Sequence, residues 1–370
     1  SKLGVMQIAI LGTRGIPNRY GGFERFAEVI SALFVNSGHV VYVLSPSTTN
    51  RIEYTDNGVA IVSIKIAEWL PKNLQTLLYD YKSLTWTSRN NIDIILECGY
   101  SFAFWILLFK QDLRNRIFTN PDGIEFKRKK WGFLAKQFLI VCERLSVKHS
   151  KAIVCDSPVL ANYFEQKYKI KPNVIPYGAY PISEDPDRGI LGEYKVNSDY
   201  FLVVSRFTPE NSLEQILSCF SHNQKPLLLV GNFNNRFGMK CYNKYGNYPN
   251  IKFLGGIYNQ SHLNALRYYS KAYIHGHSVG GTNPSLLEAM ASKCFIIAHN
   301  NDYNRFVLNN KGFYFSSETE LYNCIMKLDR MDSSSIESVK SDFINRVSSD
   351  FKWSAVSDEY IRIFNQLKTS

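Results

Sequence analysis

The stretch HGHSVGGTNPSLLEAM at residues 275–290 places two glycines and a helix-capping residue directly before an apolar segment. Asn283 is a favoured N-cap and Pro284 a favoured first helical residue, so a helix is predicted to begin here. The amides of a helix N-terminus carry partial positive charge, and Gly280 and Gly281 lack the Cβ atoms that would hold a ligand away from the backbone. This combination predicts an anion site, most naturally for phosphate.

Glu288 follows Pro284 by about one helical turn. Helical side chains lean toward the N-terminus, so its carboxylate could reach hydroxyl groups of the same ligand. The alternative is a loop that only turns a strand into a helix, because a single glycine-rich loop is weak support for a site. The candidate contacts of this stretch are Gly280, Gly281, Thr282, Asn283 and Glu288.

A second glycine-rich stretch, GTRGIPNRYGGFERF at residues 12–26, follows the first apolar segment and enters a helical pattern. It contains neither GxGxxG nor GK[ST], and it is longer than the usual connection from a strand to a helix. We expect a flexible cationic loop that closes over a diphosphate or an acceptor; a long turn is the alternative. Its candidate residues are Arg14, Gly15, Gly21, Gly22 and Glu24.

SRFTPENS at residues 205–212 follows another apolar run, and it places Arg206 at the end of a predicted strand. A guanidinium at that position could grip a diphosphate and neutralise a leaving group without a metal. The alternative is a surface salt bridge.

NPDGIEFKRKKW at residues 120–131 puts Asp122 after a predicted strand, where it is a candidate base or acceptor-binding group, or else only stabilises its own turn. A basic run follows, and cations continue among Phe and Leu residues on a predicted helix over 131–149. This mixture is typical of a surface that contacts anionic lipid, although many charge runs are only solvated faces. The run comprises Lys127, Arg128, Lys129, Lys130 and Trp131.

The chain has 370 residues and a formal net charge of +11, which together suggest two domains and anionic partners. Seven scattered cysteines without a CxxC motif favour reduced thiols and a cytoplasmic setting.

Several other classes of ligand and partner are not expected from the sequence. No nucleic-acid recognition motif appears, so nucleic acid is not an expected partner. No metal site is expected, because His275 and His277 have no third ligand nearby in sequence. A nicotinamide-dependent enzyme is disfavoured because no GxGxxG follows a strand. The opening apolar run is expected to be a strand rather than a signal peptide, and no segment is long enough to span a bilayer.

Strand and helix patterns alternate twice along the chain, which predicts an α/β protein with two Rossmann-like, doubly wound parallel-sheet domains facing an inter-domain cleft. The first domain is placed at 1–178, a linker at 179–197 and the second domain at 198–350. An amphipathic helix at 351–368 is expected to pack back onto the first domain. Ligands of such sheets bind beyond the carboxyl ends of the strands.

Five segments in order resemble a bacterial subgroup of the family 4 glycosyltransferases: ILGTRGIPNRYGGFERFAE, NPDGIEFKRKKW, DSP with IPYGA, VSRFTPENS and HGHSVGGTNPSLLEAMA. These are retaining enzymes of the GT-B fold, and several are rhamnosyltransferases of capsule, O-antigen and cell-wall polysaccharide assembly. The resemblance covers essentially the whole chain.

The resemblance implies roles for particular residues. Glu288 is similar to the second Glu of a Glu-x7-Glu pair and would bind the nucleotide ribose, whereas the first Glu position falls on Gly280. Arg206 matches the family arginine, but Asn211 stands in the place of the family lysine. Further implied contacts are the base-binding segment 253–258, with Gly255 and Ile257, and the acceptor or catalytic groups Asp156 and Tyr177.

The implied reaction transfers a sugar from a nucleoside diphosphate donor with retention of configuration and no metal cofactor. The first choice of donor is dTDP-rhamnose and the alternative is a UDP-hexose; an inactive relative that only binds the nucleotide sugar is a further alternative. The implied acceptor is a polyprenyl-diphosphate-linked saccharide. The protein would then lie in the cytoplasm, peripherally associated with the inner face of an anionic membrane.

Overall fold

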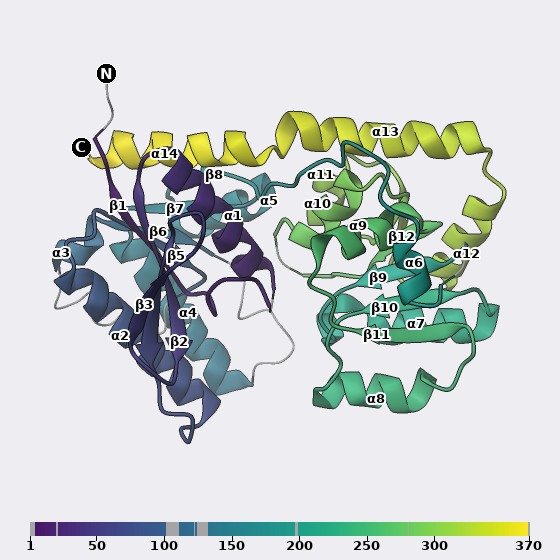
Figure 1. Cartoon of the computed structure of the whole chain (residues 1–370), viewed down its shortest axis with the longest axis horizontal. Helices are drawn as coiled ribbons and strands as arrows, with labels where there is room; N and C mark the ends of the chain where they lie inside the picture. Colours follow the sequence, from purple (N-terminus) through teal and green to yellow (C-terminus); the bar gives the residue numbers. More distant parts are fainter. Residues whose placement is uncertain are drawn as a thin grey trace. The chain divides into compact units, whose positions relative to one another are not determined.

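The computed structural model describes residues 4–19, 21–100, 111–121, 123, 132–196, 199–279 and 281–368. The chain divides into two compact units (Figure 1): Ser1–Tyr177 with Trp353–Ser370, and Gly178–Lys352.

The first unit is built on an eight-stranded sheet with the order β3-β4-β2-β1-β5-β6-β7-β8. β3 pairs antiparallel with β4, and the other neighbours pair parallel. Its strands are β1 (Gln7–Leu11), β2 (Val40–Ser47), β3 (Arg51–Tyr54), β4 (Ala60–Lys65), β5 (Ile94–Cys98), β6 (Ile117–Asn120), β7 (Ala152–Cys155) and β8 (Asn173–Val174). Its helices are α1 (Gly22–Asn36), α2 (Lys72–Arg89), α3 (Gln111–Arg114), α4 (Phe133–His149), α5 (Pro158–Tyr168) and α14 (Trp353–Lys368).

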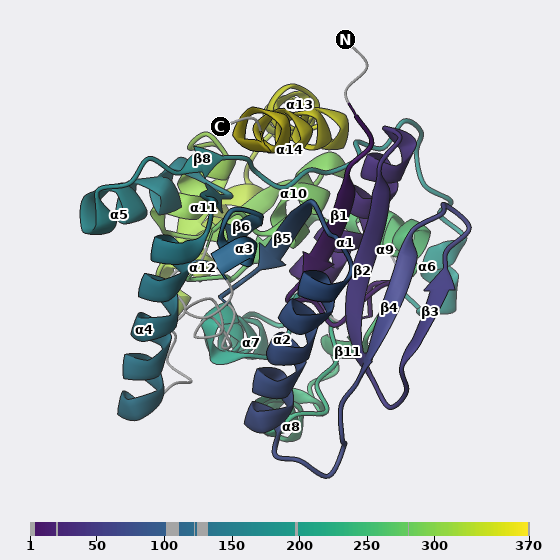
Figure 2. The ribbon, with the colours of Figure 1, turned by 90° about the vertical axis from the view of Figure 1, so that its left-hand side faces the viewer.

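Helices cover both faces of this sheet, which is why β1 and β5 are nearly continuous apolar runs. Residues of α2, α3 and α4 pack on one face in a single apolar cluster with the strands (Figure 2). On the other face, α14 lies beside α1: the Tyr360 ring is 5.7 Å from Phe26, and the Phe364 ring is 4.8 Å from Phe118 on β6. The C-terminal helix is therefore an integral part of the first unit.

The second unit contains a six-stranded parallel sheet with the order β11-β10-β9-β12-β13-β14. Its strands are β9 (Phe201–Val204), β10 (Leu227–Val230), β11 (Ile251–Gly255), β12 (Ala272–His275), β13 (Ile296–His299) and β14 (Phe313–Phe315). Its helices are α6 (Ile190–Glu193), the 3-10 turn η3 (Pro209–Asn211), α7 (Leu213–Asn223), α8 (Arg236–Tyr245), α9 (Gln260–Tyr268), α10 (Pro284–Ala291), α11 (Asp302–Val307), α12 (Glu318–Asp329) and α13 (Ser333–Asp350).

The segment 179–197 differs from the predicted linker, because it belongs to the second unit. Two tyrosines at the end of α9 hold it: the Tyr268 hydroxyl donates to Asp185 at 2.6 Å, and the Tyr269 hydroxyl donates to the Pro186 carbonyl at 2.6 Å. These anchors come from residues far along the chain, so the local pattern of turn formers gave no sign of them.

Candidate functional site

The strand order identifies where a ligand would bind in each unit. In the second unit, the chain moves outward from β9 through β10 to β11, and then returns to β12 on the other side of β9. Connections from these two central strands therefore leave in opposite directions, and in open α/β sheets the ligand-binding crevice lies at such a switch point, beyond the carboxyl ends of the strands. The loop that carries Arg206 follows β9, and the loop 276–283 follows β12. Both predicted phosphate-binding loops thus meet at one topological switch point.

The two loops are joined by the side chain of Asn211. Its Nδ2 donates to the Arg206 carbonyl at 2.7 Å and to Thr208 Oγ1 at 3.2 Å, and its Oδ1 lies 2.9 Å from His277 Nδ1. Because Oδ1 can only accept, the proton of the imidazole must be on Nδ1. The Asn211 amide is buried in this position. Asn211 therefore joins the two loops, and its predicted role in donor binding stays a prediction.

Further hydrogen bonds reinforce this junction. Ser212 Oγ donates to the Gly276 carbonyl at 2.8 Å, and both the amide and the hydroxyl of Ser278 donate to the Glu210 carbonyl. A Cβ at Gly276 would lie 2.1 Å from the Asn211 carbonyl oxygen, so only glycine permits this close approach.

Arg206 is exposed, and it lies next to the hydrogen bonds that join the loops after β9 and β12. Its guanidinium forms no ion pair or hydrogen bond with any residue that the structure describes, whereas its carbonyl is fixed by Asn211. A fixed backbone with an uncommitted guanidinium is suited to an anionic ligand.

The N-terminus of α10 forms the other wall. Asn283 caps the helix by accepting from the Ser285 amide at 2.9 Å, as the sequence predicts. Ser285 Oγ donates to the Val204 carbonyl of β9 at 3.0 Å and lies 2.6 Å from the Tyr273 hydroxyl. The amides of Gly281 and Asn283 have no acceptor within the described part of the chain. Thr282 is buried, and Gly280 lies outside the described residues.

Glu288 lies one turn further along α10 and forms an ion pair with Arg267 of α9. Glu288 Oε2 is 2.7 Å from Arg267 Nη2. The Glu288 side chain is 15% exposed and that of Arg267 is 1% exposed. The sequence pattern singled out Glu288 but gave no indication of Arg267, which is a single cation within an ordinary amphipathic helix.

The predicted base-binding segment 253–258 begins in the last residues of β11 and continues past its carboxyl end. Gly255 has φ +76°, in the region that favours glycine, and its carbonyl accepts from the Gly231 amide at 2.8 Å. Ile257 is half-buried. These residues are placed at the carboxyl edge together with Arg206 and α10.

Three histidines lie at the ends of β12 and β13. Burial lowers the pKa of His275 well below its usual value, with His277 and His299 adding to the effect, and burial also lowers the pKa of His299. Imidazole nitrogens are common metal ligands. Across the ranges that the structure describes, however, no group of three or more His, Cys, Asp or Glu side chains is arranged to hold a metal ion.

In the first unit the corresponding switch point lies between β1 and β5. The loop after β1 is held by Glu24, whose Oε1 accepts from the Arg14 amide at 2.9 Å, and by Ser45, whose hydroxyl donates to the Arg14 carbonyl at 3.0 Å. A Cβ at Gly15 would lie 2.2 Å from Ser45 Oγ. The loop is therefore folded tightly, and the Glu24 carboxylate acts as its anchor.

Two other predicted site residues of this unit, Asp156 and Tyr177, are more buried than a ligand-contacting role would suggest. Gly21 caps α1 and Gly22 begins it. Asp156, after β7, is 2% exposed, and Tyr177 is 3% exposed with its ring against Phe26 at 5.3 Å. Both side chains are packed inside the first unit, so their proposed catalytic or acceptor roles stay predictions. Asp122, Lys127, Arg128, Lys129, Lys130 and Trp131 lie outside the described residues.

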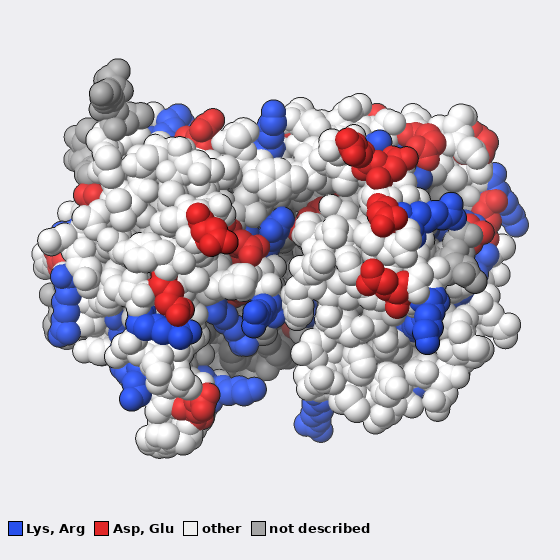
Figure 3. Space-filling view, in the orientation of Figure 1, with Lys and Arg blue, Asp and Glu red and all other residues white. Residues whose placement is uncertain are grey.

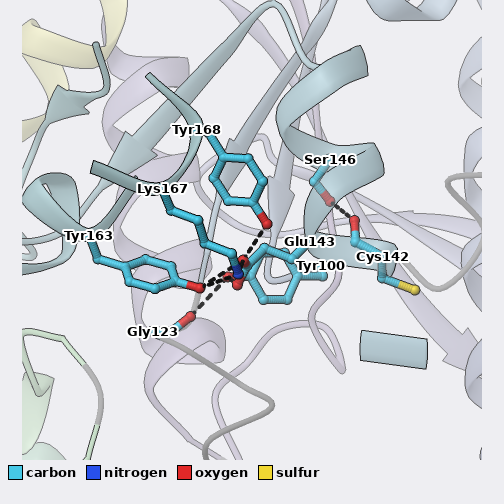
Figure 4. A network of polar contacts seen from close by, with 8 residues as sticks. All are labelled: Tyr100, Gly123, Cys142, Glu143, Ser146, Tyr163, Lys167 and Tyr168. Carbon is cyan, nitrogen blue, oxygen red and sulfur yellow. Dashed lines mark hydrogen bonds and ion pairs between the residues drawn. The ribbon is translucent and has the colours of Figure 1, made fainter. Parts of the chain in front are cut away.

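A network that the sequence did not reveal surrounds Glu143 of α4 (Figure 4). This buried carboxylate accepts from the Lys167 ammonium at 2.6 Å and from the hydroxyls of Tyr163, Tyr168 and Tyr100 at 2.9, 2.6 and 3.1 Å. The Tyr100 hydroxyl also lies 3.1 Å from the Gly123 carbonyl. The network thus ties α4 and α5 to the segments that follow β5 and β6, where the first unit would meet a ligand.

The first half of α4 extends past the ends of β5 and β6 (Figure 2) and presents apolar side chains to solvent. Leu134 is 82% exposed and Phe133 75% exposed, and Phe138 and Val141 continue the same surface. No helix in the described part of the chain is long and apolar enough to cross a membrane.

Comparison with known proteins defines the class. Residues 5–180 match the model of a domain of unknown function, DUF1972, and residues 191–321 match the model of glycosyl transferases group 1. No curated protein matches the chain in sequence.

Solved structures share the fold at low sequence identity. Sucrose-phosphate synthase from Thermosynechococcus elongatus is 14% identical with a TM-score of 0.84, covering 98% of this chain and 99% of that one. HepE from Anabaena, in complex with UDP-glucose, is 16% identical with a TM-score of 0.74, covering 98% and 100%. A glycosyltransferase from Rickettsia africae is 16% identical with a TM-score of 0.72, covering 99% of both chains.

The protein is a glycosyltransferase with the GT-B fold, built from two Rossmann-like units. The match to glycosyl transferases group 1 spans the loops after β9 and β12 and all of α10. The predicted fold class is confirmed.

Proposed function

We propose that this protein is a retaining glycosyltransferase that moves a sugar, most simply L-rhamnose from dTDP-rhamnose, onto a polyprenyl-diphosphate-linked saccharide in bacterial surface polysaccharide assembly. The family 4 and rhamnosyltransferase assignments rest on the sequence resemblance.

The observation that carries the donor site is the uncommitted guanidinium of Arg206, held beside the N-terminus of α10 at the switch point of the second sheet. The diphosphate would bind across this crevice and accept hydrogen bonds from Arg206 and from the amides of Gly281 and Asn283. The carboxylate of Glu288 would bind the ribose, and the segment at Gly255 and Ile257 would meet the base.

The same groups suit the chemistry of the leaving group. When the bond from the anomeric carbon to the phosphate oxygen breaks, negative charge develops on the diphosphate. Arg206 and the α10 N-terminus would stabilise that charge in place, and the departing oxygen would accept the proton of the acceptor hydroxyl as it attacks the same face. In this scheme the protein needs neither a carboxylate nucleophile nor a metal.

A UDP-hexose is the alternative donor. HepE from Anabaena was solved with UDP-glucose, and an Escherichia coli structure named for trehalose-6-phosphate was solved with UDP-2-fluoro glucose. A catalytically inactive nucleotide-sugar-binding relative is a further possibility, because Gly280 and Asn211 replace charged residues of the wider family.

A lipid-linked acceptor fits the exposed apolar surface of α4, which would contact the inner face of an anionic membrane together with the basic run 127–130. On the face shown in Figure 3, acidic and basic side chains of the described residues are interspersed over the second unit. Nucleic acid is not proposed as a partner, because the sequence contains no nucleic-acid recognition motif.

The test is a binding and turnover series with the purified full chain. Calorimetry with dTDP, UDP, GDP and their sugars should show one tight nucleotide, and its sugar should be transferred to a lipid-linked acceptor with retention, undiminished by EDTA. Tight binding without transfer would favour the inactive relative. Absence of binding to every nucleotide would refute the donor site.

A further inference from the structure

Arg267 is the most deeply buried cation among the described residues of the second unit, and two of its guanidinium nitrogens have no hydrogen-bond acceptor there. It is 1% exposed, and Glu288 is its ion-pair partner at 2.7 Å. Its Nε and Nη1 are buried and have no hydrogen-bond partner within the described ranges. A buried guanidinium with two unsatisfied nitrogens is costly, and replacing such a pair by apolar side chains often stabilises a protein. Stability alone therefore does not explain why an arginine is placed here.

The surroundings of Arg267 fix its position. The Ser270 hydroxyl and the Cys294 thiol donate to its backbone carbonyl at 2.7 and 3.0 Å, so the end of α9 is held against the start of β13. From this fixed point the side chain reaches α10. Only the Nη2 edge of the guanidinium meets Glu288 Oε2.

α10 is held at two positions on one side. Ser285 is tied to the end of β9 through Val204 and Tyr273, and Glu288, three residues later on the same helical face, is tied to Arg267. The first tie fixes the helix N-terminus beside Arg206. The second fixes the rotamer of Glu288, because the ion pair engages Oε2 on the α9 side.

We propose that Arg267 is a positioning residue for the donor: it orients the Glu288 carboxylate so that the carboxylate accepts hydrogen bonds from the ribose hydroxyls of the nucleotide. This proposal rests on the proposed donor site and goes beyond it, since it assigns ribose recognition to a pair rather than to one residue. It also explains why a buried cation with unsatisfied nitrogens lies one helix away from the ligand.

The experiment compares each nucleotide with its dideoxyribose analogue, using the purified full chain and calorimetry. The probes are UDP, whose sugar has 2′- and 3′-hydroxyls, and dTDP, whose deoxyribose has only the 3′-hydroxyl. Each is compared with its 2′,3′-dideoxyribose counterpart, and the readout is the ratio of the two dissociation constants. The variants are Glu288→Gln, Arg267→Met, Arg267→Lys and the double variant Arg267→Met/Glu288→Gln. Arg346→Met is the matched control, because it removes an arginine that is paired with Asp350 in the same unit.

We expect removal of the ribose hydroxyls to weaken binding to the wild type by about tenfold or more, because hydrogen bonds to a charged acceptor are strong. Glu288→Gln and Arg267→Met should each reduce this ratio to a similar small value, and the double variant should be no worse than Glu288→Gln alone. Arg267→Lys should restore part of the ratio, and Arg346→Met should leave it unchanged.

A purely structural role for Arg267 would weaken both nucleotides of a pair equally and leave the ratio intact, which would overturn the proposal. An unchanged ratio in Glu288→Gln would overturn it as well, because the carboxylate would then not recognise ribose. If the wild type bound neither UDP nor dTDP, the proposed function itself would fail. Melting temperatures of all variants identify any that fail to fold, and for those Arg267→Lys supplies the comparison.

Discussion

Asn211 and His277 lie on the loops that follow two neighbouring strands, and their side chains meet at 2.9 Å between Oδ1 and Nδ1. This contact joins the end of β9 to the end of β12, at the point where the sheet changes direction. Asn211 thus fixes the relative position of the two loops through a neutral amide. In the proposed donor site, the positive charge that would face a diphosphate comes from Arg206 and from the N-terminus of α10.

Asn211→Ala should loosen this junction. The substitution removes three hydrogen bonds from a buried position, so we expect the free energy of unfolding to fall by about 1–3 kcal/mol. Nucleotide affinity should fall as well, because Arg206 loses its fixed backbone. Urea unfolding and calorimetry measure the two effects. Asn264→Ala, which removes one hydrogen bond with Gln260 within α9, is the control and should change both quantities much less.

Arg206→Ala should weaken donor binding without changing the stability of the fold. Its guanidinium is exposed and has no described partner, so the free energy of unfolding should change by less than about 0.5 kcal/mol. Donor binding or transition-state stabilisation should lose about 2–4 kcal/mol, because the diphosphate loses its cation. Arg330→Ala, an exposed arginine at the end of α12, should affect neither property. Unchanged transfer by Arg206→Ala would remove this residue from the donor site.

Glu288→Ala should be destabilising as well as inactive. It leaves the Arg267 guanidinium buried without its counter-ion, which costs about 3–5 kcal/mol. The double variant Arg267→Met/Glu288→Ala should regain most of this stability while remaining unable to bind donor. Chemical denaturation of both variants measures the difference. If Glu288→Ala were as stable as the wild type, the ion pair would not be buried in solution as it is here.

Glu97 of β5 should make the first unit less stable at higher pH. Burial raises the pKa of Glu97 well above its usual value, and nearby Asp80 adds to the shift. The folded protein then keeps a proton that the unfolded chain has lost, so stability falls as the pH rises from the ordinary glutamate range toward the raised pKa. Glu97→Gln should reduce the loss of melting temperature between about pH 5 and about pH 8. The exposed Glu53→Gln should not, and an identical pH profile for Glu97→Gln would contradict the prediction.

The exposed surface of α4 should contribute to membrane binding. Leu134→Glu or Phe138→Glu should each lower partitioning onto anionic vesicles by about tenfold, since each removes a large apolar side chain from the interface. Vesicle sedimentation at fixed lipid concentration measures this. Tyr54→Glu, at an exposed aromatic position on β3, is the control. Equal partitioning of the wild type and the α4 variants would rule out this surface as the contact.

Local pattern in the sequence predicted those features whose causes are themselves local. The apolar runs of β1 and β12, the Asn283 cap and the position of Arg206 after a strand each depend on a few consecutive residues. Two elements with few buried apolar residues were missed. β3 is an exposed edge strand, and α13 has only Phe343 and Val347 buried, so neither shows a strong apolar period.

Only the tertiary structure decided which distant residues share a site. The pairing of Arg267 with Glu288, the bracing of Asn211 by His277 and the gathering of three tyrosines and Lys167 around Glu143 join residues whose separation in the chain carries no periodic signal. The burial of Asp156 and Tyr177 was decided in the same way, because the packing of α14 on α1 covers that side of the sheet. The sequence determined the two doubly wound units and the glycine-rich loops at the carboxyl ends of their strands. The tertiary structure decided which polar side chains are already hydrogen-bonded within the protein, because their partners lie on loops that are distant in the sequence. Polar groups without such partners are the ones that could contact a ligand.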